Sequence, residues 1–550
     1  MDNRFLAIIE DSIKNNWDLP ALSDYNGQTY KYKDFAHKIA ELHLIFDSLN
    51  IQKGNTVAIC GRNMANWVVS FFATISYGAV PTTILHDFDS QSIHNIINHS
   101  EAKFLFVGEY VWEKLDPKEM PAVETIILID DFSIIKSRSE QTIEIGSDTN
   151  LVFNKKYPDG FSPDDVKYHK EKPEELAVLN YTSGTTSTPK GVMIPYRSLW
   201  SNTRFAIDMI PFVKRGDGFV SMLPMAHMYG LAFEILLSIA KGCHINFLTR
   251  VPSPQIIVEA FAKVKPTLII AVPLIIEKII KNKVFVELDK QPVKTLIKLP
   301  FIKQVIYKKV LNKLMATFGG NLVEVVIGGA ALNKEVGDFL TKIKFPYTVG
   351  YGMTECGPLI SYEYWETYRP TSCGKPVDRM SVKIDSSDRE NISGEIMVKG
   401  DNVMLGYFKN PEETEKVIEN DGWLHTGDLG VIDKDGHIYI KGRSKTMILG
   451  GSGQNIYPEE IEGLLNNYPY VLESLIIEEE GKLVALIVPD QDQIKKGNIK
   501  QSQIESIFQN EIKNLNKRLP SYSQITKVNI RDEEFEKTPK RSIRRFLYQK

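Results

Sequence analysis

The fold of this chain is constrained most by an alternation of short β-branched runs with helical patterns. The runs that predict strands fall at residues 56–60, 103–107, 125–129, 267–271 and 322–327. Strands that are separated by helices usually pair in parallel, with the helices as crossover connections. We therefore expect an α/β fold built on parallel sheets.

The pattern changes towards the C-terminus. From about residue 391, glycine-punctuated runs such as 394–398 and 437–440 predict a small β subdomain. After Gly442 the chain is charged, with short apolar runs such as 484–488, which favours a small α+β lobe. We place the boundary so that residues 1–441 form a large N-terminal domain and residues 442–550 a C-terminal lobe.

Composition excludes some function classes. The 66 basic and 69 acidic residues nearly balance, so bulk charge gives no reason to expect a nucleic-acid partner. The four cysteines (Cys60, Cys243, Cys356 and Cys373) are isolated in the sequence, which favours a reducing compartment over a zinc site. Residues 1–16 mix acidic and basic side chains and do not resemble an export signal. The expected location is cytoplasmic, with a peripheral membrane contact left open.

One uncharged stretch, residues 67–85, has about the length of a membrane span. Polar and turn-forming residues interrupt it, among them Gly78 and Pro81. The pattern is more typical of a buried helix, a turn at Tyr77 and Gly78, and a short strand.

The most biased segment is 278–313, which contains ten lysines and only two acidic residues. Its apolar residues recur at roughly helical spacing and are interrupted by Pro300. One or two solvated amphipathic helices are the favoured interpretation. A surface for anionic lipid or for the phosphates of coenzyme A (CoA) is the alternative.

A hydroxyl-rich segment, 181–192, follows an apolar run and predicts a phosphate-binding loop. Glycine and hydroxyl groups after a strand can direct N–H and O–H donors at phosphate oxygens, and Lys190 adds positive charge. The segment is not a Walker A loop, because Pro189 precedes Lys190 and Gly191 follows it. A simple surface loop is the alternative. The candidate ligands are Thr182, Ser183, Gly184, Thr185, Thr186 and Lys190.

Two further clusters carry glycines and polar groups suited to a nucleotide. In the first, residues 328–330 precede 349–355, where Tyr351 offers a face for a base and Glu355 is a hard oxygen ligand for Mg²⁺. In the second, Asp428 can accept hydrogen bonds from a ribose and Arg443 can reach a phosphate or ribose oxygen. Each cluster alone is also compatible with an ordinary glycine-rich turn.

Taken in this order, the three clusters resemble the adenylate-forming superfamily of acyl-CoA synthetases, luciferases and peptide-synthetase adenylation domains. The resemblance covers nearly the whole chain and is strongest to long-chain fatty acid CoA ligases. It implies a large N-terminal domain of two α/β subdomains plus a β subdomain, and a mobile C-terminal lobe hinged near Lys445. It also implies ATP, Mg²⁺, CoA and a fatty acid as ligands.

The resemblance assigns roles to individual positions. Thr182 to Lys190 would hold the β- and γ-phosphates, and Asp428 and Arg443 the ribose. Thr354 would lie near the α-phosphate, and Thr182 and Glu355 would contact Mg²⁺. His227 matches the family's aromatic or histidine gate beside the acyl and pantetheine channels, although a lone histidine in an apolar stretch is more often a core residue. The remaining positions are Gly328, Gly329, Ala330, Tyr351 and Gly352 around adenine, Lys445 at the hinge, and Gly453 against the pantetheine arm.

The chain departs from the family pattern at two positions. Ser542 stands where the family has the lysine that bridges the substrate carboxylate and the α-phosphate, and a hydroxyl cannot supply that charge. Lys540 or Arg541 supplies it if the loop is shifted by one or two residues. Ser187 replaces a common glycine of the phosphate loop, which the turn tolerates if its φ is negative.

The implied reaction has two steps: a fatty acid forms an acyl-adenylate and is then transferred to CoA. Two alternatives stay open. One is an acyl-AMP ligase that loads an acyl carrier protein, and the other is a non-catalytic homologue that binds nucleotide or acyl groups.

Overall fold

The computed structural model describes residues 4–182, 189–249, 254–449, 454–538 and 543–549. A mixed sheet of eight strands forms the middle of the N-terminal part, in the order β20-β9-β8-β4-β3-β5-β6-β7. Its central strands are parallel, from β8 to β6, as the alternating pattern predicts. The bounds are β3 (Thr56–Cys60), β4 (Val80–Ile84), β5 (Phe104–Val107), β6 (Thr125–Leu128), β7 (Ile134–Ser137), β8 (Leu176–Thr182), β9 (Lys190–Pro195) and β20 (Gly406–Tyr407).

The edges of this sheet differ from the all-parallel expectation. Strands β7, β9 and β20 pair antiparallel with their neighbours. The connections from β6 to β7 and from β8 to β9 are too short for a crossover helix, so each pair is a hairpin. The β8–β9 hairpin aligns Thr182 with Lys190, at the two ends of the predicted phosphate loop.

Helices cover the central sheet, and helix α3 (Ala65–Tyr77) is the most deeply buried of them. Every residue from Ala65 to Ser76 is buried, and the helix ends at Gly78 in a left-handed conformation with φ of 91°. Strand β4 follows, which confirms the predicted helix, turn and strand. No helix in the described part of the chain is long and apolar enough to cross a membrane.

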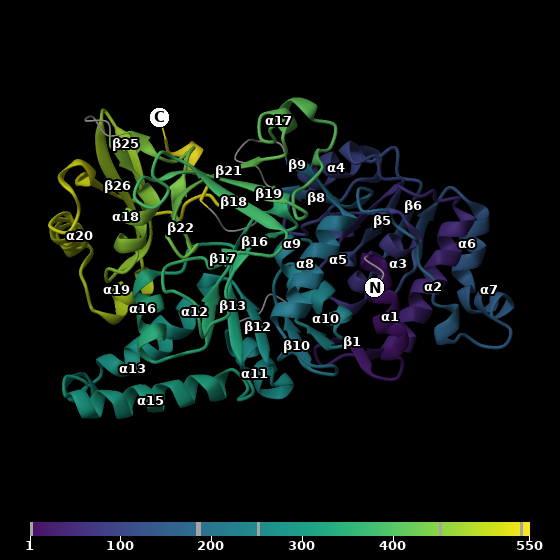
Figure 1. Cartoon of the computed structure of the whole chain (residues 1–550), viewed down its shortest axis with the longest axis horizontal. Helices are drawn as coiled ribbons and strands as arrows, with labels where there is room; N and C mark the ends of the chain where they lie inside the picture. The colour runs from purple at the N-terminus through teal and green to yellow at the C-terminus, as the bar shows by residue number, and fades with distance from the viewer. Residues whose placement is uncertain (1–3, 183–188, 250–253, 450–453, 539–542, 550) are drawn as a thin grey trace.

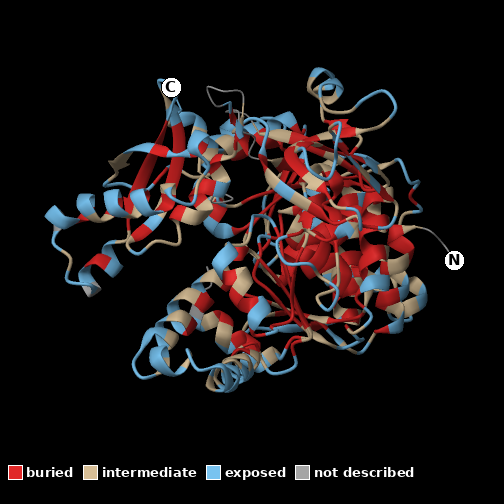
Figure 2. Ribbon diagram, turned by 60° about the vertical axis from the view of Figure 1, so that its left-hand side comes forward, coloured by how far each residue is buried: buried red, intermediate tan, exposed pale blue. Residues whose placement is uncertain are grey.

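Two smaller sheets lie beside the large one. One has the order β10-β11-β1-β2 and the other β12-β13-β14. Their bounds are β1 (Pro20–Asp24), β2 (Thr29–Lys31), β10 (Gly218–Ser221), β11 (His244–Phe247), β12 (Leu268–Ala271), β13 (Glu324–Ile327) and β14 (Tyr347–Val349). Buried side chains are concentrated where these sheets and their helices meet (Figure 2).

The other helices of this part connect or cover the strands. They are α1 (Phe5–Asn15), α2 (Tyr32–Ser48), α4 (Ser90–His99), α5 (Glu109–Trp112), α6 (Glu140–Ser147), α7 (Thr149–Lys156), α8 (Tyr196–Met209), α9 (Met228–Gly230), the π-helix η3 (Leu231–Leu236), α10 (Leu237–Ala240), α11 (Pro254–Val264) and α16 (Lys334–Lys342).

The lysine-rich segment lies in two main helical stretches, as the sequence predicts, with one short turn of helix between them. In the first stretch, α12 (Pro273–Ile279), the π-helix η4 (Ile280–Phe285) and α13 (Val286–Asp289) follow one another without a gap. The turn is α14 (Val293–Leu296), and the second stretch is α15 (Pro300–Thr317). Pro300 is the first residue of α15, a position that needs no N–H donor, so it starts a helix where the sequence pattern indicated an interruption.

A β subdomain follows, and it begins earlier than the predicted residue 391. It contains a small sheet, β15-β16-β17, and a larger one, β18-β19-β21-β22. The bounds are β15 (Tyr351–Gly352), β16 (Leu359–Tyr362), β17 (Lys375–Pro376), β18 (Met380–Asp385), β19 (Gly394–Gly400), α17 (Pro411–Glu415), β21 (Leu424–Ile432) and β22 (Ile438–Arg443).

The C-terminal segment folds as a three-stranded sheet with helices, at the left of Figure 1. After the short pair β23 (Ile448–Leu449) and β24 (Asn455–Ile456), it contains α18 (Pro458–Leu465), β25 (Val471–Glu479), β26 (Lys482–Pro489), α19 (Gln491–Lys496), α20 (Gln501–Asn516) and β27 (Ile525–Ile530). Asn467 joins it to the N-terminal part: its side-chain oxygen accepts hydrogen bonds from Lys281 at 3.2 Å and from Asn333 at 2.5 Å.

Candidate active site

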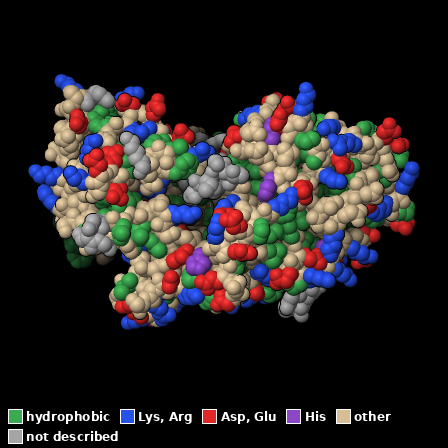
Figure 3. Space-filling model, turned by 90° about the horizontal axis from the view of Figure 1, so that it is seen from above, with side chains coloured by type: hydrophobic (Ala, Val, Ile, Leu, Met, Phe, Trp, Pro, Cys, Tyr) green, Lys and Arg blue, Asp and Glu red, His purple; other side chains and the backbone are tan. Residues whose placement is uncertain are grey.

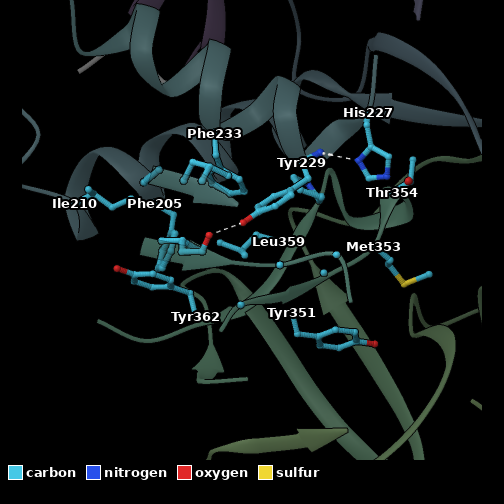
Figure 4. Close-up of a pocket in the computed structure, with 18 residues that line it drawn as sticks. Phe205, Ile210, His227, Tyr229, Phe233, Tyr351, Met353, Thr354, Leu359 and Tyr362 are labelled. Carbon is cyan, nitrogen blue, oxygen red and sulfur yellow. Dashed lines mark hydrogen bonds between the residues drawn. The ribbon is translucent and has the colours of Figure 1, made fainter. Parts of the chain in front are cut away.

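A cavity with a free volume of about 60 Å³ lies where α8, α9, η3 and the ends of β13 and β15 meet (Figure 4). It brings together six residues predicted from the sequence: His227, Gly328, Gly329, Tyr351, Gly352 and Thr354. Ala330, which the sequence predicts beside Gly328 and Gly329 at the adenine, is exposed and does not line the cavity.

One half of the cavity is apolar and aromatic, with walls that include Phe205, Phe233 and Tyr362. Tyr229 lies across this half: its hydroxyl is 3.1 Å from the carbonyl oxygen of Val326, a hydrogen bond drawn in Figure 4. It also lies 3.4 Å from the carbonyl oxygen of Ala271, the second acceptor for the same proton. These bonds fix the ring over the ends of β12 and β13. A volume of about 60 Å³ holds only a few water molecules, so the Tyr229 ring restricts what can enter.

The other half is a backbone wall made by glycines. A Cβ atom at Gly352 would lie 2.2 Å from the carbonyl oxygen of Pro358, and one at Gly328 would lie 2.9 Å from the Tyr229 ring. Only glycine allows these approaches without a shift. Both glycines line the cavity, so backbone and not a side chain forms the wall at these two positions.

His227 lies beside Thr354 at the rim between the two halves (Figure 4). It precedes α9, and its Nδ1 accepts a hydrogen bond from the backbone N–H of Tyr229 at 3.2 Å. That bond caps the helix and fixes the imidazole ring in place.

Next to the glycine wall, Tyr351 connects the cavity to a buried carboxylate. Its hydroxyl donates a 2.7 Å hydrogen bond to Asp428 Oδ2, and Arg443 Nε lies 3.0 Å from Asp428 Oδ1. Burial raises the pKa of Asp428, against the opposing effects of Arg443 and Tyr351. A carboxylate held in this way is ready to accept hydrogen bonds from paired hydroxyl groups.

A second polar cluster joins the predicted phosphate loop to Glu355. Tyr407 donates to Glu355 Oε1 at 2.9 Å, and the ammonium group of Lys190 lies 4.9 Å from the centre of the Tyr407 ring. Lys190 also forms an ion pair with Glu413 on α17.

Glu355 offers an oxygen ligand to a cation, and the donor set fits Mg²⁺ that is bound mainly through phosphates. Within the described ranges, no group of three or more His, Cys, Asp or Glu side chains could hold a metal ion by itself. Mg²⁺ is usually bound by one or two carboxylates together with substrate phosphates and water.

Comparison with known proteins identifies the family. The family model "AMP-binding enzyme" matches residues 9–408, and "AMP-binding enzyme C-terminal domain" matches residues 445–550. The chain belongs to the AMP-binding enzyme family. The resemblance predicted from the three sequence clusters is thereby confirmed.

Curated relatives of this AMP-binding enzyme include CoA ligases from distant organisms. The long-chain-fatty-acid–CoA ligase ACSBG2 of Gallus gallus is 25% identical over 520 residues, which cover 88% of this chain and 66% of that protein. The long-chain-fatty-acid–CoA ligase of Escherichia coli O157:H7 is 27% identical over 496 residues, covering 85% and 81%. A probable 4-coumarate–CoA ligase 3 of Dictyostelium discoideum is 27% identical over 479 residues, covering 85% and 80%.

Solved structures confirm the α/β fold. The ATP-bound MatB of Rhodopseudomonas palustris superposes with a TM-score of 0.76 at 22% identity and covers 100% of this chain and 98% of its own. The anthranilate CoA ligase AuaEII, in complex with anthranoyl-AMP, gives a TM-score of 0.79 at 19% identity, with 99% and 96% covered.

Several predicted site residues of the AMP-binding enzyme lie outside the described residues. These are Ser183, Gly184, Thr185, Thr186, Gly453, Lys540 and Arg541, together with Ser187 and Ser542. Lys445 is described: it is exposed, in the turn that follows β22. The segment that contains Lys540 is bracketed by a β-bridge between Lys537 and Ile543.

The sequence clusters missed the residues that line the apolar half and those that contact Lys190. Tyr229 and Phe233 follow His227 closely in the chain, so a helical pattern there could have indicated them. Tyr407 and Glu413 lie more than 200 positions from Lys190, with no motif that marks them as its neighbours.

Proposed function

We propose that this protein is an ATP-dependent fatty acid CoA ligase, an acid–thiol ligase that forms an acyl-adenylate and then an acyl-CoA. AMP and pyrophosphate are released. The observation that carries the proposal is the shape of the cavity, which joins an aromatic pocket to a glycine wall beside Tyr351 and Asp428. The names of the curated relatives support the substrate class.

In this proposal the nucleoside lies against the glycine wall. Gly328 and Tyr351 frame adenine, and Asp428, held by Tyr351 and Arg443, accepts hydrogen bonds from the ribose hydroxyls. Lys190 and the hydroxyl groups from Thr182 onward bind the β- and γ-phosphates. Glu355, with Thr182, would hold Mg²⁺, which supplies positive charge to the phosphate oxygens.

In the first step, a fatty carboxylate oxygen bonds to the α-phosphorus as the bond from that phosphorus to pyrophosphate breaks. Thr354 and His227 lie where the aromatic pocket meets the glycine wall, so they orient the carboxylate beside the phosphate. Lys540 or Arg541 supplies the positive charge that Ser542 cannot. The chemistry needs no nucleophile from the protein, because positioning and electrostatics carry it.

In the second step, the CoA thiol attacks the acyl carbonyl, and AMP leaves with the bonding electrons of the acyl–phosphate link. We propose that residues 442–550 turn about Lys445 between the steps, which brings Gly453 towards the pantetheine arm. Lys445 is exposed and lies two residues after the end of β22, so a change in its backbone angles would move everything after it.

Release of AMP and pyrophosphate from ATP, with a series of fatty acids and with or without CoA, tests the proposal. We expect AMP turnover that requires CoA and falls at least tenfold in either Lys540→Ala or Arg541→Ala. Turnover with an acyl carrier protein but not with CoA would replace the ligase by an acyl-AMP ligase. ATP binding without AMP release from any acid would make the protein a non-catalytic homologue.

A further inference from the structure

The crossover between β12 and β13 exposes an unusual group of large apolar side chains. Phe301 is 87% exposed, Val305 68%, Leu299 52% and Leu296 37%. Phe301 and Val305 are four residues apart on α15 and therefore share one face. Single exposed apolar residues are ordinary, whereas four within ten positions concentrate exposed apolar surface in one short part of the chain, which we call the apolar patch. Helix α15 stands at the lower edge of the molecule, away from the central sheets (Figure 1).

Positive charge surrounds this patch, and much of it is not neutralised by the protein. Lys290 and Lys294 pair with Glu287 and Asp289. Among the described residues, Lys298, Lys308 and Lys309 form no ion pair. Lys303 lies 5.5 Å from the centre of the Tyr307 ring. The excess is local, because residues 278–313 contain ten lysines and two acidic residues while the whole chain is nearly balanced in charge. The opposite side of the molecule, seen from above in Figure 3, has acidic and basic side chains interspersed.

We propose that α15 and the turn before it, residues 296–311, dock on the surface of an anionic lipid bilayer. Phe301, Val305 and Leu299 enter the boundary between headgroups and acyl chains, and the lysines contact lipid phosphates. Exposed aromatic and aliphatic side chains can enter the headgroup boundary while neighbouring lysines contact anionic lipid, each lysine near the surface adding to the attraction. A nucleic acid would use the lysines and leave Phe301 unburied.

The position of this segment connects the bilayer to the aromatic pocket. Strand β12 ends at Ala271 and β13 includes Val326, and the hydroxyl of Tyr229 bonds to both carbonyl oxygens. The segment therefore leaves from one edge of the pocket wall and returns to the other. If the protein has the proposed function, on which this connection rests, a long-chain acid that partitions into the bilayer would reach the pocket from there.

Vesicle flotation of the full chain tests the docking surface without using catalysis. The probes are vesicles of phosphatidylcholine alone and vesicles with added phosphatidylglycerol. We expect binding to the anionic vesicles that weakens as salt increases. Lys298→Gln with Lys308→Gln and Lys309→Gln should lower the partition coefficient by tenfold or more. Phe301→Ala with Val305→Ala should lower it about tenfold, and Phe301→Trp should retain binding.

Control variants remove the same charge, and some exposed apolar surface, elsewhere in the chain. Lys513→Gln with Lys517→Gln and Lys527→Gln removes three exposed lysines of the C-terminal segment, and Ile392→Ala truncates a side chain that is 53% exposed. Neither control should alter the partition coefficient. The proposal is overturned by the absence of binding to anionic vesicles, by equal losses in the controls, or by binding that needs the lysines and is indifferent to Phe301→Ala. Because no turnover is measured, failure of the ligase assay leaves this result intact.

Discussion

The ammonium group of Lys190 is paired with the carboxylate of Glu413, 223 residues later in the chain. Glu413 also forms an ion pair with Lys416. Its neighbour Glu412 pairs with Lys416 and not with Lys190. The hydrogen bond from Lys190, and next that from Lys416, lowers the pKa of Glu413 to about 2. The pair is therefore intact throughout neutral pH, and an incoming phosphate must compete with Glu413 for Lys190.

Glu413→Gln should strengthen ATP binding. Removing the competing charge frees Lys190, so we expect the KM for ATP to fall about two- to fivefold while kcat changes less than twofold. Glu412→Gln is the matched control and should leave both constants unchanged. A higher KM together with a lower kcat in Glu413→Gln would show instead that Glu413 holds Lys190 in its working position.

Glu324→Gln should change how stability depends on pH. Burial raises the pKa of Glu324 to about 7, and its carboxylate accepts hydrogen bonds from Tyr362 and from the backbone of Trp365. A carboxyl group whose pKa is higher in the folded state stabilises that state fully at pH values below its pKa in the unfolded chain. This stabilisation is lost as the pH rises to the folded-state pKa of about 7.

Denaturation of both proteins between pH 4 and pH 8 measures this effect. Between pH 4 and pH 8, the unfolding free energy of the wild type should fall by about 3 kcal/mol more than that of Glu324→Gln. Parallel pH profiles for the two proteins would rule out the assigned pKa.

Tyr229→Ala should shift the preference towards longer acids. The ring restricts a cavity of about 60 Å³, and removing it opens space between β12 and β13. We expect kcat/KM for a long acid relative to a short one to rise about tenfold. Tyr229→Phe keeps the ring and should keep the preference of the wild type. An unchanged ratio in Tyr229→Ala would place the acyl chain elsewhere.

Lys445→Pro should separate the two steps. Proline restricts φ at the proposed hinge, so transfer to CoA should slow about a hundredfold while acyl-adenylate formation changes less than threefold. Lys445→Ala is the control for the side chain and should leave both rates near those of the wild type. Equal slowing of both steps by proline would argue against a hinge there.

Much of the fold could be predicted because short apolar runs and glycines act locally. The run at 56–60 became β3 with the same bounds, and Gly78 ends α3 as its position indicates. At the antiparallel edges of the central sheet, β20 was missed because its partner lies far away in the sequence: Tyr407 pairs with Val192 of β9. Strands β7 and β9 belong to local hairpins, which an alternation of strands with helices does not indicate.

The residues of the candidate site also fall into those that the sequence indicates and those that only the fold brings into place. Tyr351 and Asp428 were indicated by motifs, and the structure joins them with a hydrogen bond. Glu413 carries no motif, and only the fold of α17 brings it to Lys190. Pattern reasoning finds residues whose local sequence is distinctive. It does not find those whose role comes from packing alone.

In the proposed function, this chain makes an acyl-adenylate and passes the acyl group to CoA. Single-turnover mixing of the protein with ATP, Mg²⁺ and a fatty acid, followed by mass spectrometry of the quenched mixture, measures it most directly. We expect acyl-AMP to accumulate up to the enzyme concentration without CoA, and to be converted to acyl-CoA and AMP when CoA is added. Acyl-AMP that persists unchanged in the presence of CoA, or the absence of acyl-AMP with every acid, would contradict the account.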